Sequence, residues 1–191
     1  MNPESPSETL ASSHADDVTL RSIPDAISVP PGNEVFLVGY ASGTQNYICL
    51  PAATGFDWVL FTPQATLFNR EDRQVVTHFF SPSSPAFDPT KPVPTWQAND
   101  DSSVWAVKDA SVPSPTGSID WLRLKVVATQ SGRTGGDRLS DTTYILRVDT
   151  KGGTKPSTPC TAASNVGSKN CVPYSARYIF YRSADSEDED D

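Results

Sequence analysis

The stretch Tyr174–Tyr181 reads YSARYIFY, and its alternation decides the fold class. One face of an extended chain here would carry Tyr174, Ala176, Tyr178 and Phe180, and the other Ser175, Arg177 and Ile179. Trp121–Ala128 (WLRLKVVA) repeats the pattern, with Leu122, Leu124, Val126 and Ala128 opposite Arg123 and Lys125. A period of two predicts strands with one buried and one partly solvated face. Antiparallel sheets are built from such strands.

Seven further short runs have strand composition, rich in Val, Ile, Thr and aromatic residues. They are Val35–Tyr40, Gln45–Leu50, Trp58–Phe61, Thr66–Phe68, Gln74–Phe80, Val104–Val107 and Thr142–Val148. Seventeen Pro and eleven Gly interrupt the chain, which excludes long helices over most of it. Turn signals roughly every ten residues predict an all-β fold, a single antiparallel β-sandwich or barrel. Two long Pro- or Gly-rich loops are expected, Ser81–Pro94 and Lys151–Cys171.

The net charge of −8 is concentrated at the two ends of the 191-residue chain. Residues 1–22 carry −3, residues 183–191 carry −6, and the segment between them carries +1. We therefore predict a flexible N-terminal segment (1–22), a single β domain (23–182) and a disordered acidic tail (183–191). The neutral body offers no basic patch, which argues against nucleic-acid binding. No run of 18 apolar residues is present, so no transmembrane segment is expected.

Three cysteines, Cys49, Cys160 and Cys171, allow one disulfide and one free thiol. The residues alone leave all three pairings open. A zinc site is not expected, because the chain has no CxxC motif and only two histidines. No hydrophobic region follows Met1. The protein is therefore expected to be cytoplasmic if Met1 is the native start, and secreted if a signal has been removed.

His78 is the only histidine of the predicted domain, and alternation places it on one strand face with Val76 and Phe80. It is the candidate acid/base of a catalytic site, with Asp100 or Asp101 as the carboxylate that orients it. The competing interpretation is a hydrogen-bonded structural histidine at the edge of the core. The oxygen-rich turn at 99–102 does not have the spacing of an EF-hand loop, and such turns form without a metal. We therefore predict no metal site.

Two of the four tryptophans are candidates for a ligand-binding surface. Trp96 follows the Pro-rich loop and Trp105 follows the acidic turn, so both could line a cleft for a small molecule or a glycan. Trp58 and Trp121 lie in apolar runs and are expected in the core. The glycine-rich strings GRTGG (132–136) and GGT (152–154) match neither the P-loop nor the GxGxxG fingerprint. They predict hairpin turns, and no cofactor is expected.

Six strings resemble, in order, a family of bacterial and filamentous-fungal proteins known as domain of unknown function 3455. They are VPPGNEVFLVGYASGTQNYIC, FDWVLFTPQATLF, PTWQANDDSSVW, IDWLRLKVVA, ILRVDTKGG with a following Cys, and VPYSARYIFY. The resemblance covers roughly residues 24–182. It implies a single β-rich domain, usually made with a secretion signal, and it implies no established activity. Some fungal members carry a malate dehydrogenase label, for which this sequence shows no basis.

The resemblance also carries three residue-level implications. Cys49 and Cys160 match family cysteines, which favours a Cys49–Cys160 disulfide with Cys171 left over. His78 and Trp96 match a motif of His followed by Pro-x-Trp. The family has Asp-Gly-Ser after this Trp, whereas this chain reads Asp100-Asp101-Ser102-Ser103, so a site built on that turn does not carry over.

These observations favour a secreted or envelope β-domain protein that is not catalytic, and that binds a small molecule or glycan or has a structural role at a surface. The alternative is a cofactor-free hydrolase or isomerase that uses His78 with Asp100 or Asp101 and Trp96 as a substrate wall. A third possibility is an interaction protein whose acidic tail docks onto a basic partner. The sequence leaves the ligand and the oligomeric state open.

Overall fold

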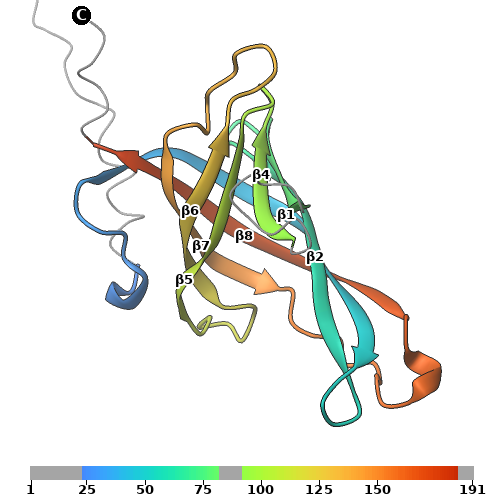
Figure 1. The fold of residues 1–191 in the computed structure, drawn as a ribbon. Helices are drawn as coiled ribbons and strands as arrows, with labels where there is room; N and C mark the ends of the chain where they lie inside the picture. Colours follow the sequence, from blue (N-terminus) through green and yellow to red (C-terminus); the bar gives the residue numbers. More distant parts are fainter. Residues whose placement is uncertain (1–22, 82–91, 185–191) are drawn as a thin grey trace, which may run out of the picture.

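A computed structural model describes residues 23–81 and 92–184, and within them the chain forms eight strands and two short 3-10 helices (Figure 1). The helices are η1 (Asp25–Ile27) and η2 (Ala163–Asn165). The strands are β1 (Asn33–Pro51), β2 (Phe56–Phe68), β3 (Gln74–Ser81), β4 (Val93–Ala98), β5 (Ser103–Val112), β6 (Trp121–Gln130), β7 (Thr142–Gly152) and β8 (Lys169–Ser183).

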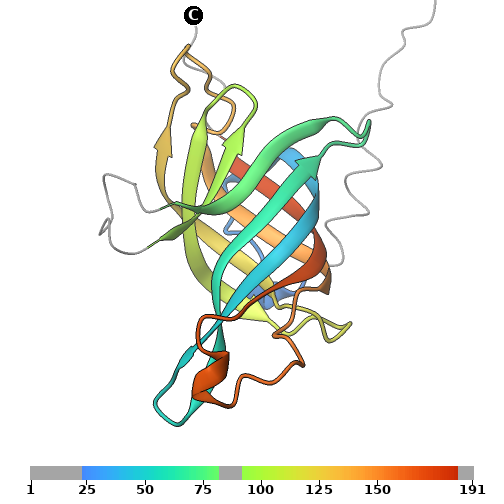
Figure 2. The ribbon, with the colours of Figure 1, turned by 90° about the vertical axis from the view of Figure 1, so that its right-hand side faces the viewer.

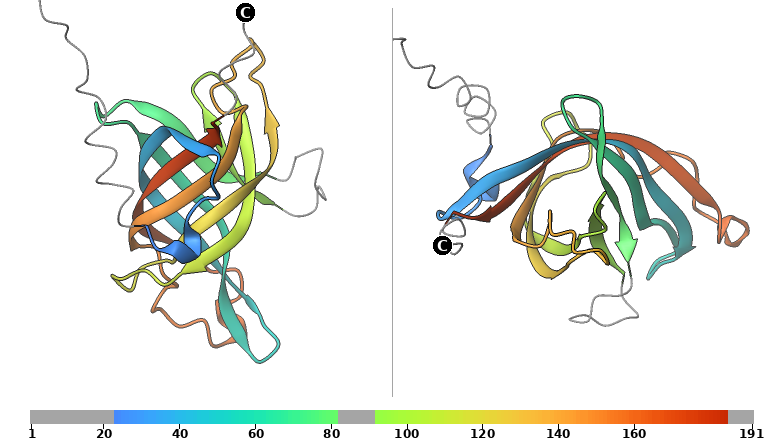
Figure 3. Two further views of the ribbon diagram at one scale, coloured as in Figure 1. Left: turned by 90° about the vertical axis from the view of Figure 1, so that its left-hand side faces the viewer. Right: turned by 90° about the horizontal axis from the view of Figure 1, so that it is seen from above.

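The strands close into one barrel. Each strand pairs antiparallel with the next one along the chain, and β8 pairs with β1 to complete the circle (Figure 2). The all-β antiparallel prediction is confirmed, and of its two forms the barrel is the one observed. Closure leaves the barrel strands without an open edge, which removes a surface for unwanted strand pairing. The hairpin of β1 and β2 and the start of β8 extend beyond the barrel wall (Figure 3).

Two pairs of predicted strands are single continuous strands. The first two predicted runs, Val35–Tyr40 and Gln45–Leu50, are joined through Gly43 in β1, where β2 lies too close for a side chain. A Cβ atom at Gly43 would stand 2.1 Å from the carbonyl oxygen of Gln64. β2 likewise continues through Pro63, next to a bulge opposite Asn46 and Tyr47, a place where a strand tolerates proline.

The short strand β4 was not predicted. Pro94 and the prolines before it indicate a loop, yet the chain from Val93 onward pairs with β3, where Pro94 stands opposite Phe80. The expected loop Ser81–Pro94 is therefore shorter than predicted at both ends, and residues 82–91 lie outside the described part of the chain. The two tertiary pairings of β4 override the local breaker signal.

The barrel interior holds the main hydrophobic core, and the apolar faces predicted for the two alternating runs lie in it, except for Ala128. The opposite face of β8, predicted to be partly solvated, is buried at Arg177 and Ile179. Buried inside are Leu124 of β6 and Tyr174, Ala176, Tyr178 and Phe180 of β8, together with residues of β1 to β5 and β7. Leu139, from the connection between β6 and β7, is fully buried in the same core. One end of the barrel is thus filled by apolar side chains.

A second apolar cluster lies on the outside of the barrel, mainly on β7 and β8, and η1, which packs against β5 and β6, contributes Ile27 to it. Its members include Ile27, Leu146, Val148, Ile179 and Tyr181. Trp121, expected in the core, packs here instead of inside the barrel.

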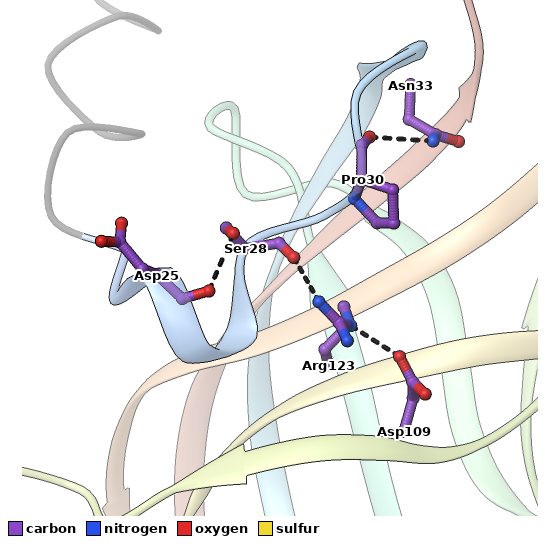
Figure 4. A network of polar contacts seen from close by, with 6 residues as sticks. All are labelled: Asp25, Ser28, Pro30, Asn33, Asp109 and Arg123. Carbon is purple, nitrogen blue, oxygen red and sulfur yellow. Dashed lines mark hydrogen bonds and ion pairs between the residues drawn. The ribbon is translucent and has the colours of Figure 1, made fainter.

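Polar contacts hold this N-terminal segment in place (Figure 4). Arg123 donates through Nη1 to the Ser28 carbonyl and through Nε to Asp109 Oδ2 at 2.7 Å. Asn33 Nδ2 donates to the Pro30 carbonyl at 3.1 Å. The segment before β1 is therefore part of the folded domain.

The predicted flexible segment 1–22 and most of the predicted acidic tail, 185–191, lie outside the described residues. Ser183, the first residue of the predicted tail, is the last residue of β8. In the described ranges, no helix has the length and apolar character needed to cross a membrane.

Candidate functional site: a cavity in the barrel

The half of the barrel away from Leu139 contains a cavity of about 610 Å³ that is partly open to solvent and to which all eight strands contribute. The connections β5–β6 and β7–β8 form its mouth through Ser118–Asp120, Thr154 and Lys155. This volume lies in the range of small-molecule sites. Eight-stranded barrels either fill their interior with side chains or hold one small ligand. This barrel does both, at opposite ends.

Three rings in mutual contact form one wall of the cavity. The rings of His78 (β3) and Trp96 (β4) lie parallel, with centroids 4.2 Å apart. Tyr178 (β8) meets both at a steep angle, with centroids 5.4 Å from His78 and 5.8 Å from Trp96. His78 and Trp96 are paired across the β3–β4 ladder, which places the two rings on the same inner face. The structure thus brings together two residues that the sequence singled out, His78 and Trp96.

His78 is a neutral imidazole in this site. Burial lowers its pKa to about 3, and although a hydrogen bond with Thr95 acts in the opposite direction, it does not offset the burial. Nδ1 lies 2.8 Å from the Thr95 carbonyl oxygen. Since a carbonyl can only accept, Nδ1 carries the proton and Nε2 is left as the acceptor. A base with so low a pKa is poorly matched to proton transfer near neutral pH.

The disulfide predicted from the family resemblance is present, between Cys49 and Cys160, and Cys171 is a free, exposed thiol. The disulfide packs with Trp58 and Tyr47 in a third apolar cluster next to the mouth. Trp58 Nε1 donates to the Thr158 carbonyl at 2.8 Å, and Tyr47 Oη donates to the Gly153 carbonyl at 2.7 Å. These contacts fix the β7–β8 connection, whose Thr154 and Lys155 border the cavity.

Asp100 and Asp101 lie at the opposite end of the barrel. The chain meanders, so the turn between β4 and β5 is at the end where β6 connects to β7. Asp100 Oδ1 accepts from Ser102 Oγ at 2.6 Å, and Oδ2 accepts from the Arg138 amide at 3.0 Å. Burial would raise the pKa of Asp100, but these hydrogen bonds outweigh it and hold the pKa below its ordinary value.

The structure therefore does not bring the two aspartates to His78. Asp100 connects the β4–β5 turn to the β6–β7 connection. The two segments lie so close that a Cβ atom at Gly136 would stand 2.1 Å from the carbonyl oxygen of Asp100. Asp101 has a φ of 67° and closes the turn by donating its amide to the Ala98 carbonyl. A catalytic role for His78 with either carboxylate stays a prediction. Among the residues described here, no group of three or more acidic, histidine or cysteine side chains could hold a metal ion.

Trp105 is on the other side of the wall from Trp96. It stands opposite Thr95 in the β4–β5 ladder, whereas Trp96 stands opposite the interior residue Val104. Trp105 is buried, but it borders a polar depression on the outer surface with Gln97 and Arg133. The structure therefore separates the two predicted ligand-binding tryptophans, and only Trp96 lines the cavity.

Arg147 is a cavity residue that the sequence analysis did not single out. It lies on β7 between Leu122 of β6 and Tyr178 of β8, two residues that also line the cavity. The signal was present, since Ile145 and Arg147 share a strand face and Ile145 is fully buried. A cation in the inward register of a strand is a departure from the apolar pattern that marks a functional position.

The family model described as protein of unknown function (DUF3455) matches residues 30–182, most of the chain. The chain belongs to this family. The matched range begins before β1 and ends within β8, so the DUF3455 domain is the barrel itself. No curated protein and no solved structure matches the chain. Membership of the DUF3455 family carries no activity with it.

Proposed function

We propose that this DUF3455 barrel is a non-catalytic binding module that holds one small, largely apolar molecule in its cavity. The observation that carries the proposal is the cavity of about 610 Å³ with its wall of His78, Trp96 and Tyr178. A mostly apolar, aromatic lining with a few polar groups is the usual composition of small-molecule sites. A closed eight-stranded barrel supplies a rigid frame for such a site.

The properties of His78 support binding over catalysis. A catalytic acid would have to carry a second proton, which its pKa of about 3 prevents at neutral pH. A neutral ring with a fixed Nδ1–H instead offers a flat surface and one acceptor nitrogen to a ligand.

The alternative, a cofactor-free hydrolase or isomerase, has one observation in its favour, which is that His78 lines the cavity. It predicts turnover of a simple ester such as p-nitrophenyl acetate that the exchange His78→Phe abolishes. We expect no turnover that depends on His78. Such turnover, seen in a well-folded sample and lost in the variant, would replace binding by catalysis as the function.

Occupancy of the cavity is tested with the neutral fluorescent probe N-phenyl-1-naphthylamine. We expect saturable binding with one probe per chain. Leu122→Trp, which fills the cavity, should weaken binding at least tenfold. Val59→Trp, the matched exchange at an exposed position of β2, should leave it unchanged. Thermal unfolding of both variants verifies that they are folded. Equal binding by wild type and Leu122→Trp, or none by wild type, would contradict the proposal.

We further propose that the protein works in an extracellular or envelope compartment. The Cys49–Cys160 disulfide supports this, because such bonds persist in oxidising compartments and are rare in the cytosol. Alkylation of the protein taken directly from its native cells should label Cys171 and leave the other two cysteines unlabelled. Labelling of all three would place the protein in a reducing compartment.

A further inference from the structure

The cavity contains a cation that has no carboxylate partner. Arg147 points into the barrel interior from β7, and in the described ranges no Asp or Glu forms an ion pair with it. The ion pairs of the domain belong to other arginines and lysines, for example Arg123 with Asp109 and Arg177 with Asp149. A positive charge in a largely apolar enclosure is costly unless an anion compensates it.

The protein uses only part of the hydrogen-bonding capacity of Arg147. Nε and Nη2 both donate to one acceptor, the carbonyl oxygen of Asp120, at 3.2 and 2.9 Å. A guanidinium has five N–H groups, so donors are left over after these two bonds and the hydrogen bond to the Tyr178 hydroxyl. The two bonds to the Asp120 carbonyl also fix the plane of the guanidinium. A fixed, planar fork is the group that best matches a carboxylate.

Two more donors of the cavity lining lack a well-placed acceptor. Gln45 Nε2 and Trp96 Nε1 are buried, and neither forms a hydrogen bond of normal geometry within the described part of the chain, although the Tyr174 hydroxyl lies near Gln45. Both residues line the same cavity as Arg147, and their exposed fractions are 2% and 1%. Buried donors are normally satisfied. An excess of donors over acceptors in one enclosure favours a ligand that brings acceptors.

Most of the charges around the mouth are positive. Lys108 and Lys155 line the cavity with Arg147, and Asp120 is the one carboxylate in the described lining. Asp57 forms an ion pair with Lys155, so the positive charge at the rim of the cavity is neutralised only in part. The chain as a whole carries −8. The cavity is therefore a positive region within an acidic protein, and such a region attracts anions.

The charge of Arg147 affects the pKa values of two tyrosines that line the cavity. Burial raises the pKa of Tyr178 and of Tyr47, and the charge of Arg147 acts against burial at both hydroxyl groups. The field of Arg147 thus favours negative charge at two separate points around the cavity.

We propose that the ligand of this barrel is a small carboxylic acid with an apolar, ring-sized body, and that Arg147 anchors its carboxylate. The ring would lie among His78, Trp96 and Tyr178, and the free donors of Gln45 and Trp96 would supplement the Arg147 contact. This inference rests on the proposed function, because it assigns the ligand class of the same cavity.

The test compares three probes of the same shape: indole-3-acetic acid, its neutral amide and the amine tryptamine. Each competes with N-phenyl-1-naphthylamine, which is uncharged and therefore reports cavity occupancy independently of charge. With wild-type protein at pH 7 and low salt, we expect the acid to displace the dye at a concentration at least tenfold below that of the amide, and tryptamine to be weakest. Added salt should weaken the competition by the acid and leave the competition by the amide unchanged.

Arg147→Met should remove the preference, so that acid and amide compete equally, while dye affinity is retained. Arg147→Lys keeps the charge and should keep part of the preference. The control Arg138→Met removes an exposed arginine at the opposite end of the barrel and should behave as wild type. If Arg147→Met does not fold, the salt dependence and Arg147→Lys still test the proposal.

The outcomes separate the two proposals. Dye binding to the cavity with equal competition by acid and amide, or with competition by neither, would overturn the carboxylate assignment and leave the binding function intact. A preference for the acid that survives Arg147→Met would overturn the role of Arg147. No dye binding by wild type would overturn the binding function, and the ligand class with it.

Discussion

At the scale of single residues, His78 makes stability depend on pH. Its pKa is about 3 when folded and about 6.5 when unfolded. Below pH 6.5 the unfolded chain takes up a proton that the folded protein cannot. The stabilisation is therefore complete above pH 6.5 and is lost as the pH falls towards 3. Between pH 7 and pH 5 the free energy of unfolding should fall by about 2 kcal/mol.

The measurement is urea unfolding at both pH values, for wild type and for His78→Phe. Phenylalanine keeps a ring against Trp96 but has no titrating nitrogen, so the part of the pH dependence due to His78 should disappear. The variant is expected to be less stable at pH 7 by about 1–3 kcal/mol, because the Thr95 carbonyl loses its donor. An identical loss between pH 7 and pH 5 in both proteins would mean that His78 titrates normally.

Of the residues that line the cavity, the sequence identified His78 and Trp96 and did not identify Arg147. His78 and Trp96 could be identified because one is the only histidine of the domain and both lie in recognisable strings. Asp100 was misleading, since an acidic turn has the same composition whether it faces a cavity or bonds to Ser102 and a neighbouring loop. Arg147 gave a weaker signal, because one cation in a strand is ordinary unless the inward face is known.

At the scale of elements, β1 depends on a glycine in its middle. The strand continues through Gly43 because its backbone approaches that of β2 closely, and a Cβ atom would meet Gln64 O at 2.1 Å and the Ala65 Cα atom at 2.5 Å. Gly43→Ala should lower the free energy of unfolding by about 1–3 kcal/mol. Ser42→Ala, at the exposed neighbouring position, should change it by less than about 0.5 kcal/mol. Equal effects of the two exchanges in urea unfolding would refute the close approach.

The disulfide acts on the connection between β7 and β8. Cys49 and Cys160 are 111 residues apart, and in the chain-entropy model closing such a loop stabilises the folded state by about 4–5 kcal/mol. The double exchange of these cysteines to serine should cost about that much in urea unfolding, whereas Cys171→Ser should cost almost nothing. Since Thr154 and Lys155 belong to this connection and border the cavity, the double variant should also bind N-phenyl-1-naphthylamine more weakly. A double variant as stable as Cys171→Ser would contradict the entropic account.

Element boundaries were predicted least well, and the reason is tertiary. Gly43 and Pro63 are local breaker signals, but each lies where two strands approach or bulge, which a single sequence does not reveal. β4 is short and begins with Val93-Pro94, so only its pairing with β3 and β5 makes it a strand. Long alternating runs such as those in β6 and β8 were predicted correctly, because their pattern repeats over several residues.

At the scale of the whole molecule, the barrel has a filled end and a hollow end. Leu139 and the core around Phe180 occupy one end, and the cavity with Arg147 occupies the other. The sequence predicted a sandwich or a barrel but not closure, since closure depends on the pairing of β1 with β8, which are far apart in the chain. The cavity follows from closure, so it could not be predicted either.

The most direct test of the cavity as the binding site is a two-dimensional NMR titration that follows the four tryptophan indole N–H signals. They report on different places: Trp96 in the cavity, Trp58 beside the disulfide, Trp105 on the outer wall and Trp121 under the N-terminal segment. Saturation with N-phenyl-1-naphthylamine should shift the Trp96 signal strongly and leave those of Trp105 and Trp121 in place. An unmoved Trp96 signal, with shifts at Trp105 or Trp121, would place the ligand outside the barrel and contradict the account.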